Sequence, residues 1–165
     1  AAPGVPGEIA VAGPQIMRGY WNNPAADADV FVNGYLRTGD VGTIDEDGYL
    51  RVVDRIKDMI AVGGFKVFPS QIEAVLYRHP AVREAIVIGV DDAYHGEMPK
   101  AFVTLRPDAP PHIDGETLKD WLNPQLGKHE RVIAVEVRLN LPKTLVGKLS
   151  RKELVAEEKA KAAGE

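Results

Sequence analysis

The sequence predicts an α+β protein in which a β-rich amino-terminal segment precedes a small domain of alternating strands and helices. Residues 7–54 contain short apolar segments separated by turns, with no clear helix. After Asp54 the pattern changes to buried strands that alternate with segments of helical periodicity. The 165 residues are 45% hydrophobic and 27% charged, which is enough for one moderate core or two small ones.

The first segment is predicted to form strands and turns throughout. EIAVAG, residues 8–13, alternates small or apolar residues as an exposed strand does, and the following GPQIMRGYWNNP is typical of a loop. VGTIDEDGYLRVVD, residues 41–54, indicates a hairpin centred on Asp47-Gly48, because this dipeptide favours tight two-residue turns.

The second segment is predicted to form a hairpin, a three-stranded sheet and flanking helices. Gly63-Gly64 separates DMIAV from FKVF and allows the positive φ angles of a tight turn. Ser70 and Glu73 match a capping box at the start of a helix that ends before Pro80. The remaining predicted elements are strands at 84–90, 100–105 and 132–139, a polar loop at 91–99, a helix at 114–126 interrupted near Asn123-Pro124, and a final helix with a second capping box, Ser150 and Glu153.

Composition excludes several classes of function. A net charge of −4 argues against general nucleic-acid binding, which depends on excess Lys and Arg. No cysteine is present, so disulfides, thiolate metal sites and thiol nucleophiles are excluded, and a reducing, cytoplasmic compartment is expected. No apolar run approaches the ~20 residues of a membrane span, the start AAPGVPGEIA has no signal-peptide pattern, and we predict no metal site.

Two polar stretches have both a structural and a functional interpretation. Asp40 in GYLRTGD follows a glycine and can simply cap a turn, or its carboxylate can accept hydrogen bonds from a vicinal diol such as ribose. The alternating charges of DRIKD, residues 54–58, are typical of a solvated connector, yet a connector between two domains is also where a hinge lies. The residues alone leave both alternatives open.

A third stretch, LPKTLVGKLSR, contains a Gly-Lys pair that partly matches a phosphate-binding loop. That motif requires Ser or Thr after the lysine and a glycine five residues before the second glycine, but these positions hold Leu149 and Pro142. By position alone, Lys148 is a lysine on a surface loop before a helix.

Four motifs in a fixed order resemble the carboxyl-terminal part of the acyl-adenylate-forming enzymes. They are YLRTGD, DRIKDMIAVGGFKVFPSQIEAVL, GEMPKAFVTL and LPKTLVGKLSRKEL, and the resemblance extends from about Gly7 to Leu154. The sequence is most similar in these motifs to the bacterial fatty acyl-CoA synthetases. Each motif by itself is weak, but their order and spacing together are specific.

The resemblance implies a domain organisation and a reaction. Residues 1–54 would be the end of a large ATP- and acid-binding domain, 55–57 a hinge, and 58–165 a small, mobile carboxyl-terminal domain. In this family a carboxylic acid and ATP give an acyl-adenylate and pyrophosphate, and the thiol of coenzyme A then displaces AMP. The phosphate loop, the fatty-acid pocket and the residues for Mg²⁺ would lie in the large domain, so we expect the 165 residues alone to be inactive.

The resemblance also implies roles for individual residues. Asp40 would hold the ribose hydroxyls of ATP and AMP, with Arg55 assisting at the ribose and phosphate. Lys148 would enter the cleft during adenylation and bridge the substrate carboxylate and the α-phosphate, as the catalytic lysine.

The hinge and the coenzyme A site would lie close together in the sequence. Lys57 occupies the family's hinge position. Gly63 and Gly64 would lie along the pantetheine tunnel, and Lys66 would steer the phosphates of coenzyme A.

Two alternatives remain beside a fatty acyl-CoA ligase. One is an enzyme of the same superfamily that adenylates an aryl acid or transfers the acyl group to a carrier protein. The other is a non-catalytic module that uses the small domain for docking.

Overall fold

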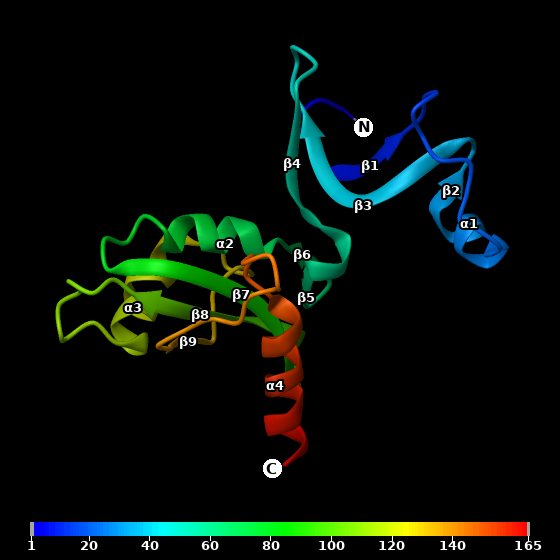
Figure 1. The fold of residues 1–165 in the computed structure, drawn as a ribbon. Helices are drawn as coiled ribbons and strands as arrows, with labels where there is room; N and C mark the ends of the chain where they lie inside the picture. The colour runs from blue at the N-terminus through cyan, green and yellow to red at the C-terminus, as the bar shows by residue number, and fades with distance from the viewer. Residues whose placement is uncertain (1, 165) are drawn as a thin grey trace. The chain divides into compact units, whose positions relative to one another are not determined.

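The computed structural model describes residues 2–164 and divides into two compact units (Figure 1). One unit ends at Lys57 and the other begins at Asp58. Each unit has its own sheet, with four strands in the first and five in the second. The two units are therefore described separately.

The first unit is an antiparallel sheet built on one long strand. β3 (Tyr35–Ile44) pairs with β1 (Gly7–Val11), β2 (Phe31–Val32) and β4 (Leu50–Arg55). The β3–β4 connection confirms the predicted hairpin, and Gly48 adopts the positive φ of 86° that the turn requires. A short 3₁₀ turn, η1 (Ile56–Asp58), follows β4.

Residues 7–54, for which no clear helix was predicted, contain one short helix. α1 (Pro24–Val30) begins after Asn23, whose side chain accepts a hydrogen bond from the Ala26 amide at 3.2 Å, and Pro24 occupies the first turn. The helix has seven residues and none of them is buried. It therefore lacks the apolar periodicity by which a helix is recognised in a sequence.

The second unit confirms the predicted α+β class. β7 (Val82–Asp92) and β8 (Gly96–Leu105) form a long antiparallel pair, and β9 (Ala134–Val137) runs parallel to β8. The hairpin of β5 (Ile60–Val62) and β6 (Phe65–Val67) joins β8 where Val62 pairs with Gly96. The helices are α2 (Pro69–Leu76), α3 (Gly115–Leu122), which continues into the 3₁₀ turn η2 (Asn123–Gln125), and α4 (Arg151–Ala163).

Three local predictions in this unit need correction. The polar loop predicted at 91–99 is mostly strand, because β7 and β8 continue to the pair Asp92–Gly96. The helix predicted to start at Ser70 begins one residue earlier, at Pro69 with Phe68 as its N-cap, and the Glu73 carboxylate accepts a hydrogen bond from the Val87 amide. Ser150 is the N-cap of α4, but its side chain makes no capping hydrogen bond.

The strands β7 and β8 place apolar side chains on both faces of the sheet. Successive side chains of a strand point to opposite faces, and here Val87 belongs to one buried cluster and Ile86 to another. Helices α2 and α3 cover the first face, and α4 covers the second through Leu154, which is fully buried against Phe102. The unit therefore has three layers, with α4 alone on its side of the sheet.

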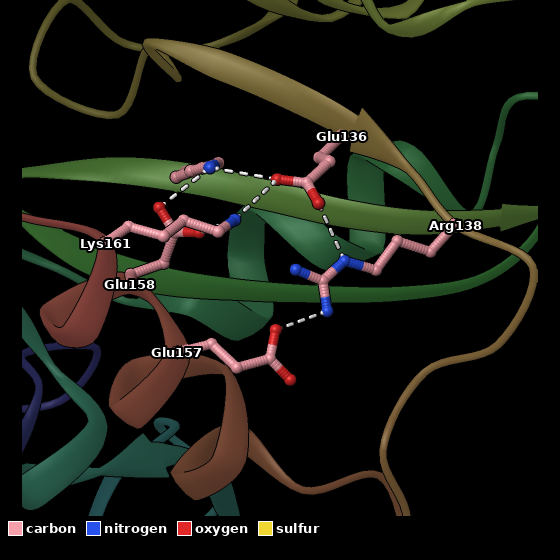
Figure 2. Close-up of polar contacts among 6 residues, drawn as sticks. Glu136, Arg138, Glu157, Glu158 and Lys161 are labelled. Carbon is pink, nitrogen blue, oxygen red and sulfur yellow. Dashed lines mark hydrogen bonds and ion pairs between the residues drawn. The ribbon is translucent and has the colours of Figure 1, made fainter. Parts of the chain in front are cut away.

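Helix α4 is also held by a network of charged side chains (Figure 2). The Lys100 ammonium of β8 lies 2.8 Å from Glu158 of α4 and 3.0 Å from Glu136 of β9. Arg138 contacts Glu136 at 2.8 Å and Glu157 at 2.6 Å, and Lys161 contacts Glu158 at 2.7 Å. The two cations Lys100 and Arg138 also lie over the ring of Phe102, which connects the network to the apolar cluster beneath it.

The network lowers the pKa of the Glu158 carboxyl. Burial by itself raises this pKa, but hydrogen bonds and charge from Lys100 and Lys161 outweigh burial and leave it below its ordinary value. A carboxyl with a depressed pKa in the folded state stabilises the fold above its unfolded pKa, and this contribution is lost as the pH falls.

No helix within residues 2–164 is long and apolar enough to cross a membrane.

Leu154→Ala should destabilise the second unit by about 2–5 kcal/mol, since it leaves a cavity in a fully buried cluster. Chemical denaturation monitored by circular dichroism measures the loss. The matched control is Leu139→Ala, because Leu139 is 96% exposed and its truncation should have almost no effect. Equal effects of the two substitutions would contradict the packing described.

Glu158→Gln should reduce the stability of the fold at neutral pH and flatten its dependence on pH. The wild-type chain should lose stability as the pH falls through and below about 4.5, the ordinary pKa of the group, because its paired carboxylates become protonated. Urea titrations at a series of pH values measure both effects. If Glu158→Gln shows the same dependence of stability on pH as the wild type in this range, protonation of Glu158 does not contribute to that dependence.

Candidate functional site

Asp40 and Arg55 face each other across the β3–β4 ladder. They are register partners, and the Arg55 Nε donates to Asp40 Oδ1 at 3.0 Å. Neither side chain is buried, with 30% of the Asp40 and 55% of the Arg55 side chain exposed. The structure thus brings together the two residues expected to hold a nucleotide, and one carboxylate oxygen of Asp40 is oriented by the guanidinium.

The backbone around this pair is fixed by short-range contacts. Gly39 has a φ of 74°, a conformation that favours glycine. The Thr38 hydroxyl donates to the Ile9 carbonyl at 2.9 Å and accepts from the Asp40 amide at 3.1 Å. On the other strand, the Arg55 amide donates to the buried carboxylate of Asp54 at 2.8 Å. Thr-Gly-Asp is therefore a structural unit that orients Asp40, which the motif alone did not show.

Lys57 lies in η1, the short turn that follows β4. Its side chain is exposed, and among residues 2–164 it has no hydrogen-bond or ion-pair partner. The boundary between the two units falls within this turn, after Lys57, and the hinge role of Lys57 remains a prediction.

Gly63 and Gly64 form the turn of the β5–β6 hairpin, as predicted, with φ angles of 55° and 86°. The Gly63 amide donates to the His95 carbonyl at 2.8 Å, which joins this turn to the β7–β8 turn. Lys66 on β6 is exposed, and its side chain has no ionic partner in the described part of the chain. The adjacent Phe65 ring stacks on His129, with ring centroids 3.6 Å apart, a contact that no sequence motif indicated.

Lys148 lies on a small hairpin rather than on an irregular loop. Lys143 and Leu149 form an antiparallel bridge, and the Thr144 amide donates to the Lys148 carbonyl at 2.7 Å. Gly147 closes the turn with a φ of 79° and donates its amide to the Thr144 carbonyl. All hydrogen bonds of Lys148 among residues 2–164 are made by its backbone, so its ammonium is exposed and unpaired.

Both ends of this hairpin, residues 142–150, are attached to the second unit. The Lys143 ammonium lies 2.6 Å from Glu84 on β7, and Leu141 and Leu149 pack into the apolar cluster under α4. At the other end, Arg151 binds Glu73 of α2 at 2.6 Å. Neither Arg151 nor Glu84 was predicted from the sequence to attach this hairpin. The available signal for Arg151 was its place in LPKTLVGKLSR, three residues after Lys148. Glu73 was predicted to belong to a capping box.

The predicted site residues therefore form three local groups. Asp40 and Arg55 are paired in the first unit, while the second unit carries the glycine turn with Lys66 and, on a separate hairpin, Lys148. Among the residues that the structure describes, no cluster of three or more His, Asp or Glu side chains could hold a metal ion.

Comparison with known proteins relates this chain to adenylate-forming enzymes. Residues 71–148 match the family described as the AMP-binding enzyme C-terminal domain. A long-chain fatty acid CoA ligase of Bacillus subtilis is 46% identical over 96% of this chain, and a feruloyl-CoA synthase of Amycolatopsis is 44% identical over 92%. The chain spans about 28% and 30% of the lengths of these two relatives.

Solved structures agree with this relationship. ATP-bound MatB from Rhodopseudomonas palustris has a TM-score of 0.90 and 35% identity, and the match covers 96% of this chain and 31% of that one. An o-succinylbenzoate CoA synthetase from Bacillus subtilis, in complex with its acyl-adenylate intermediate, has a TM-score of 0.81 and 37% identity over 93% and 31% of the two chains. The chain therefore belongs to the AMP-binding, acyl-adenylate-forming enzymes and corresponds to their carboxyl-terminal part.

Proposed function

We propose that this chain is the terminal part of an ATP-dependent acyl-CoA ligase that acts on fatty acids. In the first half-reaction an oxygen of the acid attacks the α-phosphorus of ATP, and the bond to pyrophosphate breaks. In the second, the sulfur of coenzyme A attacks the acyl carbon, AMP leaves with the bonding electron pair, and the thiol proton is released. Residues 1–54 belong to the large domain, 55–57 to the hinge and 58–165 to the small domain in this proposal.

The observation that carries the proposal is the hairpin of Lys148. This hairpin presents the exposed ammonium of Lys148, which has no ionic partner among residues 2–164. Both ends of the hairpin are attached to the second unit, where the neighbouring Lys143 and Arg151 are engaged in ion pairs. An ammonium held ready for an anion suits adenylation, because two anions must approach and negative charge grows on the phosphorus. Lys148 is therefore assigned as the catalytic residue that stabilises this charge.

Asp40 and Arg55 are assigned to the nucleotide. The guanidinium occupies one carboxylate oxygen of Asp40 at 3.0 Å and leaves the other able to accept from ribose hydroxyls. Arg55 is about half exposed and keeps donors that can reach ribose or phosphate oxygens. The pair thus offers an acceptor for a diol and a donor for an anion side by side.

The remaining residues are assigned to the second half-reaction and to the change between the two. Lys57 lies in the turn proposed as the hinge, and movement there would let Lys148 leave after adenylation and admit the thiol. The hairpin turn Gly63-Gly64 has no side chains that would block pantetheine, and Lys66 beside it can attract the phosphates of coenzyme A. Mg²⁺ would be bound with ATP by residues of the large domain.

The substrate acid is proposed from the relatives. Long-chain fatty acid CoA ligases from Bacillus subtilis and Escherichia coli O157:H7 are 46% and 44% identical to this chain. Feruloyl-CoA synthase, at 44%, supports an aryl acid as the second candidate. An acyl-CoA formation assay on the complete enzyme with fatty acids of several lengths and with aryl acids distinguishes the two.

Lys148→Ala should nearly abolish adenylation in the complete enzyme, leaving a small residual rate, while sparing thioester formation from a supplied acyl-adenylate. Loss of a group that stabilises transition-state charge costs roughly a hundredfold to a thousandfold in rate. Pyrophosphate exchange measures the first half-reaction, and acyl-CoA formation from the adenylate measures the second. Lys152→Ala is the matched control, because Lys152 is an exposed lysine on α4, four residues after Lys148, and it takes no part in attaching the hairpin. An equal loss of both half-reactions in Lys148→Ala would contradict this role.

Asp40→Asn should raise the KM for ATP about tenfold to a hundredfold, because a hydrogen bond to a charged group contributes roughly 1.5–3 kcal/mol. The effect on the Kd for AMP, measured by calorimetry, should be similar. Asp47→Asn serves as the control, since Asp47 is an exposed carboxylate in the turn of the same β3–β4 hairpin. If both substitutions leave the KM unchanged, Asp40 does not bind the nucleotide.

A further inference from the structure

Arg151 connects the hairpin of Lys148 to the body of the second unit. It is the first residue of α4 and follows Lys148 by three positions. Its Nη2 lies 2.6 and 2.8 Å from the two carboxylate oxygens of Glu73. Its Nε donates to the Val87 carbonyl at 3.2 Å, and its Nη1 lies 3.7 Å from Asp58. A single guanidinium thus contacts α2, β7 and Asp58, the first residue of the second unit.

These contacts share atoms and are largely shielded from solvent. Glu73 Oε1, which accepts from Arg151 at 2.6 Å, also accepts from the Val87 amide at 2.9 Å. Val87 of β7 therefore contributes both its amide and its carbonyl to these contacts. Only 14% of the Glu73 side chain and 28% of the Arg151 side chain are exposed. A planar, delocalised guanidinium can make such divergent contacts at once, whereas a lysine ammonium is a point charge.

The position of the Lys148 ammonium depends on this anchor. The hairpin 142–150 is closed at its base by the Ser150 amide, which donates to the Pro142 carbonyl at 2.9 Å. One leg continues to Lys143 and its ion pair with Glu84, and the other continues directly into Arg151. Loss of the second attachment would leave the hairpin fixed on one side only. A displacement of about 1 Å at a reacting centre can cost a hundredfold in rate.

We propose that Arg151 is a positioning residue for Lys148: bound to Glu73 and to the Val87 carbonyl, it holds the Lys148 hairpin in the geometry that adenylation requires. This inference rests on the proposed function of Lys148. Arg151 acts only through Lys148 and does not contact the substrate. Its contribution is confined to the half-reaction that uses Lys148.

The kinetic test uses Arg151→Lys and Glu73→Gln in the complete enzyme. Each should lower pyrophosphate exchange roughly tenfold to a hundredfold and leave thioester formation from supplied acyl-adenylate nearly unchanged. Arg138→Lys is the matched control, because Arg138 is also an arginine paired with two carboxylates, but these belong to Glu136 of β9 and Glu157 of α4 and do not attach the hairpin. An unchanged ratio of the two half-reactions in both test variants would overturn the proposal.

A double substitution separates positioning from a direct effect. In the Lys148→Ala background, Arg151→Lys should cause no further loss of pyrophosphate exchange, since the group that it positions is gone. A full additional loss would overturn the positioning role. If Lys148→Ala itself fails to impair adenylation selectively, the proposed function fails, and this outcome differs from a failure confined to Arg151.

The structural test needs no activity. Hydrogen exchange of the 165-residue chain should show faster exchange of the amides of residues 142–150 in Arg151→Lys and Glu73→Gln than in the wild type. Exchange of β7 and β8 should change little, which shows that the domain remains folded. Arg138→Lys should leave residues 142–150 unaffected. Unaltered exchange of this segment in both test variants would overturn the proposal.

Discussion

The second unit depends on the burial of both faces of the β7–β8 ribbon. Alternation along the two strands sends Val87 to one face and Ile86 and Phe102 to the other. The first face is covered by α2 and α3, whereas the second depends on one helix, α4, docked through Leu154. Because α4 begins immediately after the Lys148 hairpin, the packing that completes the core also determines where that hairpin is attached.

Two sets of cationic side chains in this unit bear on the proposed site. In the first group, Lys100, Arg138, Lys143 and Arg151 are engaged with carboxylates and attach α4 and its preceding hairpin to the sheet and to α2. In the second group, Lys66 and Lys148 have exposed side chains without an ionic partner among the described residues. Paired cations organise the fold, and unpaired ones remain able to bind an external anion, which is the basis on which the site was proposed.

Both units use glycine in the turns next to the proposed site. Gly39, Gly63 and Gly147 each adopt a positive φ, and each lies next to a residue or turn assigned to the proposed site. Side chains are strained in this conformation, so these turns are local structures that the sequence specifies directly. The β3–β4 hairpin at Asp47-Gly48 and the β5–β6 hairpin at Gly63-Gly64 were predictable for the same reason.

The sequence by itself determined the α+β class, the two hairpins, the interrupted helix at Asn123-Pro124 and, through ordered motifs, the family. These features depend on local propensity and on residues that lie close together in the chain. The tertiary structure alone decided the extended β7–β8 ribbon, the Asp40–Arg55 pair and the binding of Glu73 by Arg151, which are 78 residues apart. A Glu three residues after a Ser predicts a local role at a helix terminus, whereas its contact with a guanidinium 78 residues away is set only when the chain folds.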